Sequence, residues 1–163
     1  TNPRILRAMK ENDILAYIQP VFVDLDMNTV EPAIGTHRME GIYAWKTMLN
    51  LGIHASGGSD APVVSFDAME NIYFAVTRKN INGEPKEGWI PSERLTVDEA
   101  VKLFTKYAAY ASYTEDENGT IETGKNADFV VLEKDLYEID PDEIKTTKVD
   151  MTILGGETVF ERK

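Results

Sequence analysis

The chain has 163 residues, no cysteine and a formal net charge of −11, from 17 basic and 28 acidic side chains. This length suits one compact domain with a small appendage, and a hydrophobic fraction of 42% is ordinary for a soluble globular protein. The lack of cysteine excludes disulfide frameworks, thiolate metal sites and a cysteine nucleophile. The acidic balance argues against nucleic acid or anionic membranes as partners, because phosphate groups bind positive surfaces. The sequence shows neither a membrane span nor a signal peptide, so we expect a cytoplasmic protein.

Helix and strand patterns alternate through the first two thirds of the chain. It opens on Thr1-Asn2-Pro3-Arg4, without an initiator methionine and directly in a helical pattern, so we expect a piece of a longer protein. The patterns predict, in order, a helix from Pro3 to about Asn12, a strand buried on both faces over Ile14–Ile18, a long loop over 20–35, a helix over 36–50, a strand over Ile53–Gly57, a helix over 66–76, a loop over 79–95 and a helix over 96–111 that begins with a capping box of Thr96 and Glu99.

The pattern changes to short strands after Tyr113. Strands are predicted over 129–132, 149–154 and 157–161, and Gly155-Gly156 is a strong hairpin signal between the last two. We place a domain boundary near residues 114–120. The alternating part is typical of parallel α/β folds, but two strands cannot close a sheet, and an eight-stranded barrel needs about 250 residues.

A carboxylate directly after a buried strand is the sharpest local feature. Asp60 follows Gly57-Gly58-Ser59 and precedes Pro62. The carboxyl ends of parallel strands hold catalytic groups in α/β folds, where an aspartate can bind a divalent metal or take a proton from water. The alternative is that Asp60 caps a helix or a turn, and spacing alone favours that alternative. The two glycines also give a weak phosphate-loop signal.

The remaining chemistry-bearing residues are few. His37 falls at a predicted helix start and His54 near the start of a strand, so surface or structural roles are expected for both. Trp89 lies in a loop between Gly88 and Pro91, where it can either line a pocket or anchor the loop. The acidic side chains between 133 and 143 lack the spacing of a calcium loop.

Four stretches together resemble one family. The segment from Ala55 to Val63 resembles the eighth-strand motif of the metal-dependent amidohydrolase superfamily, in its N-substituted formamide deformylase-like branch. Three further stretches agree in order and spacing: Ile18-Gln19-Pro20 with the end of the seventh strand, Gly88-Trp89-Ile90-Pro91 followed by Glu93-Arg94-Leu95-Thr96 with the loop before the penultimate helix, and Gly119–Leu132 with the re-entry into the small β domain. The resemblance covers essentially the whole chain.

This resemblance implies an α/β fold that forms the C-terminal portion of a (β/α)₈ TIM barrel plus part of a small β-sandwich domain. Residues 1–114 would be the last βα units of the truncated barrel, and 120–163 the C-terminal part of the sandwich. Asp60 would bind a divalent metal, usually zinc, and move a proton from the attacking hydroxide, which reverses the choice made from spacing. Phe22 stands where many relatives carry a histidine, and with Trp89 it is a candidate substrate contact.

The family's other metal ligands would all precede Thr1, so we expect the chain alone to bind no metal tightly and to be inactive. The parent protein would hydrolyse a non-peptide C–N bond of a small amide- or formamide-like molecule by metal-activated water. Its partners would be that substrate and the missing N-terminal part, with a homo-oligomer as a further option. One alternative is a non-catalytic regulatory or interaction module of the same fold, and another is a phosphate- or nucleotide-binding domain that uses Gly57-Gly58.

Overall fold

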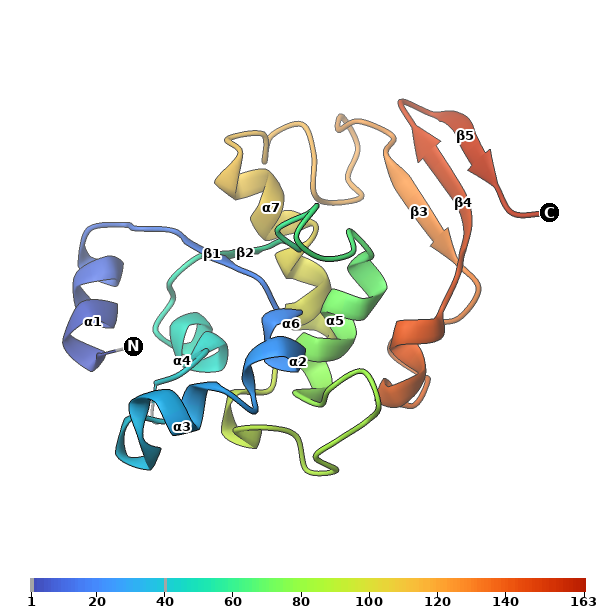
Figure 1. Cartoon of the computed structure of the whole chain (residues 1–163). Coiled ribbons are helices and arrows are strands. Elements are labelled where there is room, and N and C mark those ends of the chain that lie inside the picture. Colours follow the sequence, from blue (N-terminus) through green and yellow to red (C-terminus); the bar gives the residue numbers. More distant parts are fainter. Residues whose placement is uncertain (1, 40) are drawn as a thin grey trace.

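The computed structural model describes residues 2–39 and 41–163. Helices and strands alternate up to residue 111, and strands dominate from residue 129 onward (Figure 1). The elements are α1 (Pro3–Glu11), β1 (Ala16–Ile18), α2 (Phe22–Asp26), α3 (Val30–Ile34), the 3₁₀ turn η1 (Thr36–Arg38), α4 (Trp45–Asn50), β2 (Ala55–Gly57), α5 (Ala68–Thr77), η2 (Pro91–Glu93), α6 (Val97–Leu103), α7 (Lys106–Ala111), β3 (Phe129–Leu132), η3 (Pro141–Thr146), β4 (Val149–Leu154) and β5 (Glu157–Glu161).

The strands β1 and β2 form a two-stranded parallel sheet with Ala16 opposite Ala55 and Ile18 opposite Gly57. Both strands lie inside the predicted ranges. The expectation that the first strand is buried on both faces is wrong, because the Tyr17 side chain is 64% exposed. Such a strand needs cover above and below and a neighbour on each edge, whereas β1 pairs with β2 alone within the described residues. The Tyr17 hydroxyl donates to the Ala111 carbonyl at 3.1 Å.

The core is centred on α5, as Figure 1 shows from its place between the parallel sheet and η3. Every residue of α5 from Asn71 onward is buried, so this helix lacks a solvent face. Its observed range agrees with the helix predicted over 66–76 to within two residues. The core around it also draws on the strands and the other helices, through Val23, Trp45, Ala55, Leu95 and Leu103 among others.

Three predicted segments differ from the structure. The predicted loop over 20–35 contains two five-residue helices, α2 and α3, which are too short to show a helical period, and Pro32 is tolerated in the first turn of α3. The predicted helix over 36–50 is helical only at its two ends, as η1 and α4, because Tyr43 adopts a left-handed backbone with φ 47°. The predicted helix over 96–111 breaks into α6 and α7.

The last three strands form an antiparallel sheet in the order β3-β4-β5. Gly155 and Gly156 make the β4–β5 turn with φ of 58° and 85°, values that a type I′ turn requires, so the predicted hairpin is confirmed. The predicted boundary at 114–120 stays a prediction. It lies between the end of α7 at Ala111 and the start of β3 at Phe129.

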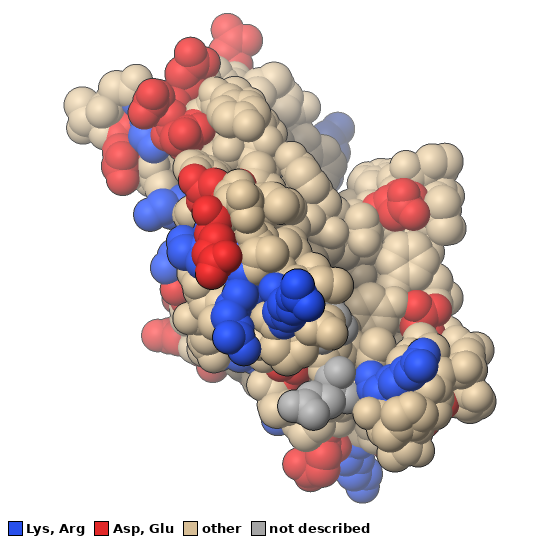
Figure 2. Space-filling view, turned by 90° about the vertical axis from the view of Figure 1, so that its left-hand side faces the viewer, with Lys and Arg blue, Asp and Glu red and all other residues tan. Residues whose placement is uncertain are grey.

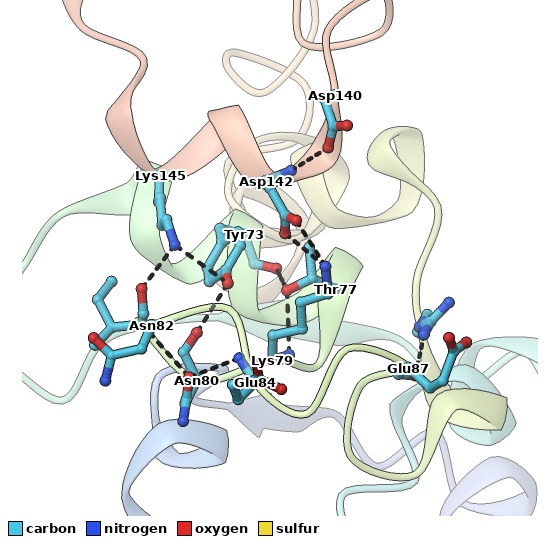
Figure 3. Close-up of polar contacts among 12 residues, drawn as sticks. Tyr73, Thr77, Lys79, Asn80, Asn82, Glu84, Glu87, Asp140, Asp142 and Lys145 are labelled. Atoms are coloured by element: carbon cyan, nitrogen blue, oxygen red, sulfur yellow. Dashed lines mark hydrogen bonds and ion pairs between the residues drawn. The ribbon is translucent and has the colours of Figure 1, made fainter.

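The connection from β3 to β4 passes over α5 and joins the two parts of the chain. Ile144 of η3 is fully buried. Asp142 and Lys145 of the same segment make polar contacts with α5 and the loop that follows it (Figure 3). Lys145 Nζ donates to the Ile81 carbonyl at 2.7 Å, and its ammonium lies 4.5 Å from the centre of the Tyr73 ring. Lys79 pairs with Asp142 at 2.7 Å. The antiparallel sheet is therefore anchored to the central helix through the segment between its own strands.

Acidic and basic side chains both occur on the face that carries α1 (Figure 2). Across the described residues, no helix combines the length and the apolar character that a membrane crossing requires.

The predicted capping box at the start of α6 is confirmed and yields a pH-dependent prediction. The Thr96 N–H donates to Glu99 Oε2 at 2.8 Å, the Glu99 N–H donates to Thr96 Oγ1 at 3.2 Å, and Lys46 Nζ contacts Glu99 Oε1. Burial raises the pKa of Glu99, but the hydrogen bonds from Lys46 and Thr96 outweigh burial and hold the pKa below its usual value.

Because the folded-state pKa of Glu99 is depressed, its ionised form contributes stability above the usual glutamate pKa of about 4.3, and this contribution disappears as the pH falls through the folded-state value. Replacing Glu99 by Gln keeps the capping geometry and removes the charge. We expect Glu99→Gln to lower the free energy of unfolding by about 0.5–1 kcal/mol at pH 7 and by much less at pH 3, measured by urea titration. Lys46→Met is the matched control, and an equal loss for Glu99→Gln at both pH values would contradict the prediction.

Candidate functional site

Asp60 lies just beyond the carboxyl end of β2, in the loop that leads to α5. The Gly58 N–H donates to the Ile18 carbonyl at 2.9 Å, which extends the pairing of β1 and β2 to the start of this loop. Asp60 has a left-handed backbone with φ 61°, and its carbonyl accepts from the Val63 N–H at 2.9 Å. The residue is exposed. A carboxylate is thus presented to solvent at the edge of the sheet where α/β enzymes place catalytic groups.

The capping alternative for Asp60 is wrong for the following helix. The N-cap of α5 is Asp67, whose Oδ1 accepts from the Met69 N–H at 2.8 Å. Asp67 fulfils the role that spacing alone had favoured for Asp60. The phosphate-loop alternative also loses support, because the Gly58 N–H is already bound to Ile18.

Gly57 fixes where the candidate loop begins. A Cβ added at Gly57 would lie 2.6 Å from Cζ of Phe104, so only glycine lets the Phe104 ring pack against the end of β2. Phe104 occupies the break between α6 and α7. The Phe104 ring, at this break, therefore packs against the end of β2 that leads to Ser59 and Asp60.

Phe22 lies at the same edge of the sheet as Asp60. It is the first residue of α2, which follows the end of β1, and its side chain is half-buried against the core. Since β1 and β2 are parallel, their following loops meet at one edge. The structure thus brings the loops of two of the three predicted site residues together.

Trp89 lies at the opposite end of α5. Its ring centre is 5.7 Å from that of Tyr43 and 5.5 Å from the guanidinium of Arg78, the residue that ends α5. The ten-residue helix α5 starts on the side of Asp60 and spans about 15 Å. Trp89 is held by this cluster at the far end of that span, so its contacts favour the loop-anchoring alternative over a substrate contact.

The centre of this cluster, Arg78, is a residue that the sequence analysis missed. Its side chain is fully buried. Nε donates to the Trp89 carbonyl at 2.9 Å, Nη1 donates to the Tyr43 carbonyl at 3.0 Å, and the guanidinium lies 4.6 Å from the centre of the Trp45 ring. Burial lowers the pKa of Arg78 to about 10, against an opposing effect of Glu93, so the group stays charged at neutral pH. An arginine next to Lys79 carries no sequence signal of burial.

Neither histidine joins Asp60. His54 stacks on Tyr110 with ring centres 4.2 Å apart, and His37 is exposed in η1, so the predicted structural and surface roles are confirmed. Within residues 2–39 and 41–163, no group of three His, Asp or Glu side chains could hold a metal ion. Asp60 can supply one ligand, so the described residues do not form a complete metal site.

Solved structures of larger proteins share this fold. An uncharacterized metal-dependent hydrolase from Pyrococcus horikoshii OT3 superimposes on 86% of the chain and 28% of its own, with a TM-score of 0.77 and 20% sequence identity. Guanine deaminase from E. coli superimposes on all of the chain and 38% of its own, with a TM-score of 0.69 and 18% identity. The sequence pattern of the amidohydrolase family matches residues 1–160, and the chain belongs to this family.

Two curated relatives support the same family membership. The putative amidohydrolase YtcJ of Bacillus subtilis is 38% identical over 145 residues, which cover 89% of the chain and 27% of YtcJ. The N-substituted formamide deformylase of Arthrobacter pascens is 33% identical over 121 residues, which cover 74% of the chain and 22% of that enzyme. The chain thus spans about a quarter of the length of these relatives. The predicted superfamily and the predicted fold class, part of an amidohydrolase barrel with part of a small β domain, are confirmed.

Proposed function

We propose that the chain is the C-terminal part of a metal-dependent amidohydrolase that hydrolyses a C–N bond of a small amide- or formamide-like molecule. One observation carries the proposal: within a segment that matches the family, a solvent-facing carboxylate, Asp60, follows the carboxyl end of a parallel strand. The name of the relative that deformylates N-substituted formamides supports the reaction class. We further propose zinc as the metal and the cytoplasm as the location.

In this proposal Asp60 moves the proton of the reaction. A bound divalent metal supplies Lewis acidity and lowers the pKa of water. Asp60 accepts the proton from the water that attacks the substrate carbonyl and returns it to the leaving nitrogen, so one carboxylate acts first as base and then as acid. Because Asp60 is exposed, its carboxylate is accessible to water and substrate. Phe22, at the same sheet edge, contributes an apolar surface for the substituent on the substrate nitrogen.

In this proposal the other catalytic groups come from parts of the protein outside these 163 residues. Asp60 alone offers one ligand, and catalytic zinc is held by three protein ligands. The 163-residue chain is therefore expected to be inactive by itself.

The test compares the chain with a catalytically complete protein that contains it. Purified residues 1–163, with and without added Zn²⁺, should hydrolyse N-substituted formamides no faster than buffer, whereas the complete protein should bind metal, measured by elemental analysis, and turn the substrate over. A complete protein that takes up metal but hydrolyses no amide would contradict the reaction class. Hydrolysis by the 163 residues alone would contradict the assignment of the missing ligands.

A second candidate, a non-catalytic interaction module, is favoured by one feature of the sheet. Within the described residues β1 and β2 pair only with each other, so each strand has one unpaired edge, and Tyr17 exposes most of its ring. Such edges require a covering partner. A module of this kind, as a homo-oligomer or with an obligate partner, should be multimeric in light scattering. A monodisperse monomer would count against it.

A further inference from the structure

The two loops at the carboxyl edge of the sheet are joined by one buried amide. Asn71, in the first half of α5, is polar and yet only 1% exposed. Its Oδ1 accepts from the Val21 N–H at 3.1 Å, and its Nδ2 donates to the Asp67 carbonyl at 3.0 Å. Both hydrogen-bonding ends of the side chain are therefore used.

Each end of this bridge reaches one of the site loops. Val21 stands between the end of β1 and Phe22, and its buried N–H has no other acceptor in the described structure. Asp67 closes the loop that carries Asp60, as the N-cap of α5. The amide is oriented in only one way, because its oxygen must face the N–H and its nitrogen must face the carbonyl.

No other hydrogen bond among the described residues links 19–27 to 58–71. The direct contact between the two strand exits, from the Gly58 N–H to the Ile18 carbonyl, belongs to the sheet pairing and precedes both loops. Apolar side chains of both segments also pack in the common core, so Asn71 supplies the directional, hydrogen-bonded link between them, and removal of this amide would leave a buried N–H without a partner.

We propose that Asn71 is a positioning residue that holds the Phe22 segment in register with the Asp60 loop. The functional consequence rests on the function proposed above, whereas the structural link does not. Asn71 does not touch the reacting atoms; it acts through the backbone of Val21 and Asp67.

The test is residue-resolved hydrogen exchange of the complete chain, comparing Asn71→Leu with a matched variant on the same helix. Leucine has the same branched arrangement of heavy atoms as asparagine, although it is bulkier, and it cannot accept a hydrogen bond from Val21. We expect the protection of the Val21 amide to fall about tenfold or more beyond any change in the α6 amides, because a buried hydrogen bond is lost locally. Thr77→Val removes another buried bond of α5, from Thr77 Oγ1 to the Tyr73 carbonyl at 2.8 Å, at the far end of the helix, and should leave Val21 protected.

Two further arms separate local from global effects. Asn71→Asp in its protonated form can accept from Val21 and donate to Asp67, so its Val21 protection should approach that of the wild type at low pH. The ionised carboxylate can still accept from Val21 but repels the Asp67 carbonyl, so the protection should be lower once the carboxyl ionises. In a catalytically complete protein, Asn71→Leu should lower kcat/KM at least tenfold more than Thr77→Val. Equal Val21 protection in Asn71→Leu and the wild type would overturn the positioning role. An inactive wild-type protein with the expected exchange pattern would refute the proposed function and leave the role of Asn71 standing.

Discussion

Replacing Arg78 by alanine should lower the free energy of unfolding by about 3–5 kcal/mol, the largest stability loss expected for a single substitution in this chain. The change leaves the Trp89 carbonyl without its donor, removes one of the two donors to the Tyr43 carbonyl, which keeps the Trp45 N–H at 2.8 Å, and opens a cavity beside the Trp45 ring. The aromatic contacts contribute further, because a desolvated cation over an aromatic face is worth about 2 kcal/mol. Urea titration at pH 7 measures the loss.

Burial of the Arg78 charge destabilises the folded state and so opposes these contacts. The control variants must separate the two effects. Nη2 of Arg78 is buried without a partner among the described residues, and burial lowers the pKa of the guanidinium, so the charged group is stabilised incompletely. Arg78→Met fills the space without the charge and should recover part of the loss. A methionine variant more stable than the wild type would show that desolvation outweighs the two hydrogen bonds.

The effect of the Arg78 backbone conformation on stability must be measured separately from the effect of its side chain. Arg78 ends α5 in a left-handed conformation with φ 56°, which costs about 1–2 kcal/mol for a non-glycine residue. Arg78→Gly should therefore be about 1 kcal/mol more stable than Arg78→Ala while losing the same contacts. The exposed ion pair next to it gives a matched charge control: Lys79→Ala, which removes the pair with Asp142, should cost less than about 1 kcal/mol.

The parts of the fold that could be predicted are those set by local sequence. The Gly155-Gly156 turn, the capping box of Thr96 and Glu99, and the cap and proline that start α1 each depend on neighbours within four residues, and all are present. The packing of Phe104 at the break between α6 and α7 could not be predicted, because its ring contacts a glycine 47 positions earlier in the chain, Gly57. The helical spacing of apolar residues over 96–111 continues across Phe104 and does not reveal the break.

The candidate site was predictable only in part, for a similar reason. Asp60 was singled out by its place after a strand and by the family resemblance, and its position beyond β2 is local to that strand, whereas its catalytic role stays a prediction. The roles of Trp89, Arg78 and Asn71 depend on which end of α5 each residue faces, and that is decided by packing. Charged and amide side chains are mostly exposed, so burial of Arg78 and Asn71 contradicts the expectation from composition. Both side chains form hydrogen bonds to segments distant in the sequence, Arg78 to Tyr43 and Asn71 to Val21.

Asp60→Asn should lower kcat of a catalytically complete protein by about 10²–10⁴-fold, with a smaller change in KM, because an amide cannot accept and return the proton. Asparagine has the same shape and adopts the left-handed backbone of this position readily, and the side chain is exposed. The free energy of unfolding should therefore change by less than about 0.5 kcal/mol, which separates a chemical loss from a folding defect. Steady-state kinetics with urea titration of the same samples measures both quantities.

Asp13 supplies the matched control for Asp60. It is also exposed and also left-handed, with φ 54°, but it precedes β1, so it lies at the amino end of the parallel sheet rather than the carboxyl end. Asp13→Asn therefore repeats the change in charge and backbone context away from the site, and should leave kcat within about twofold of the wild type, since a surface charge at this distance is screened by salt. If both variants lose activity equally, the effect belongs to the acidic surface as a whole. If neither loses activity, the proton is carried by another group, and Asp60 has no part in the chemistry.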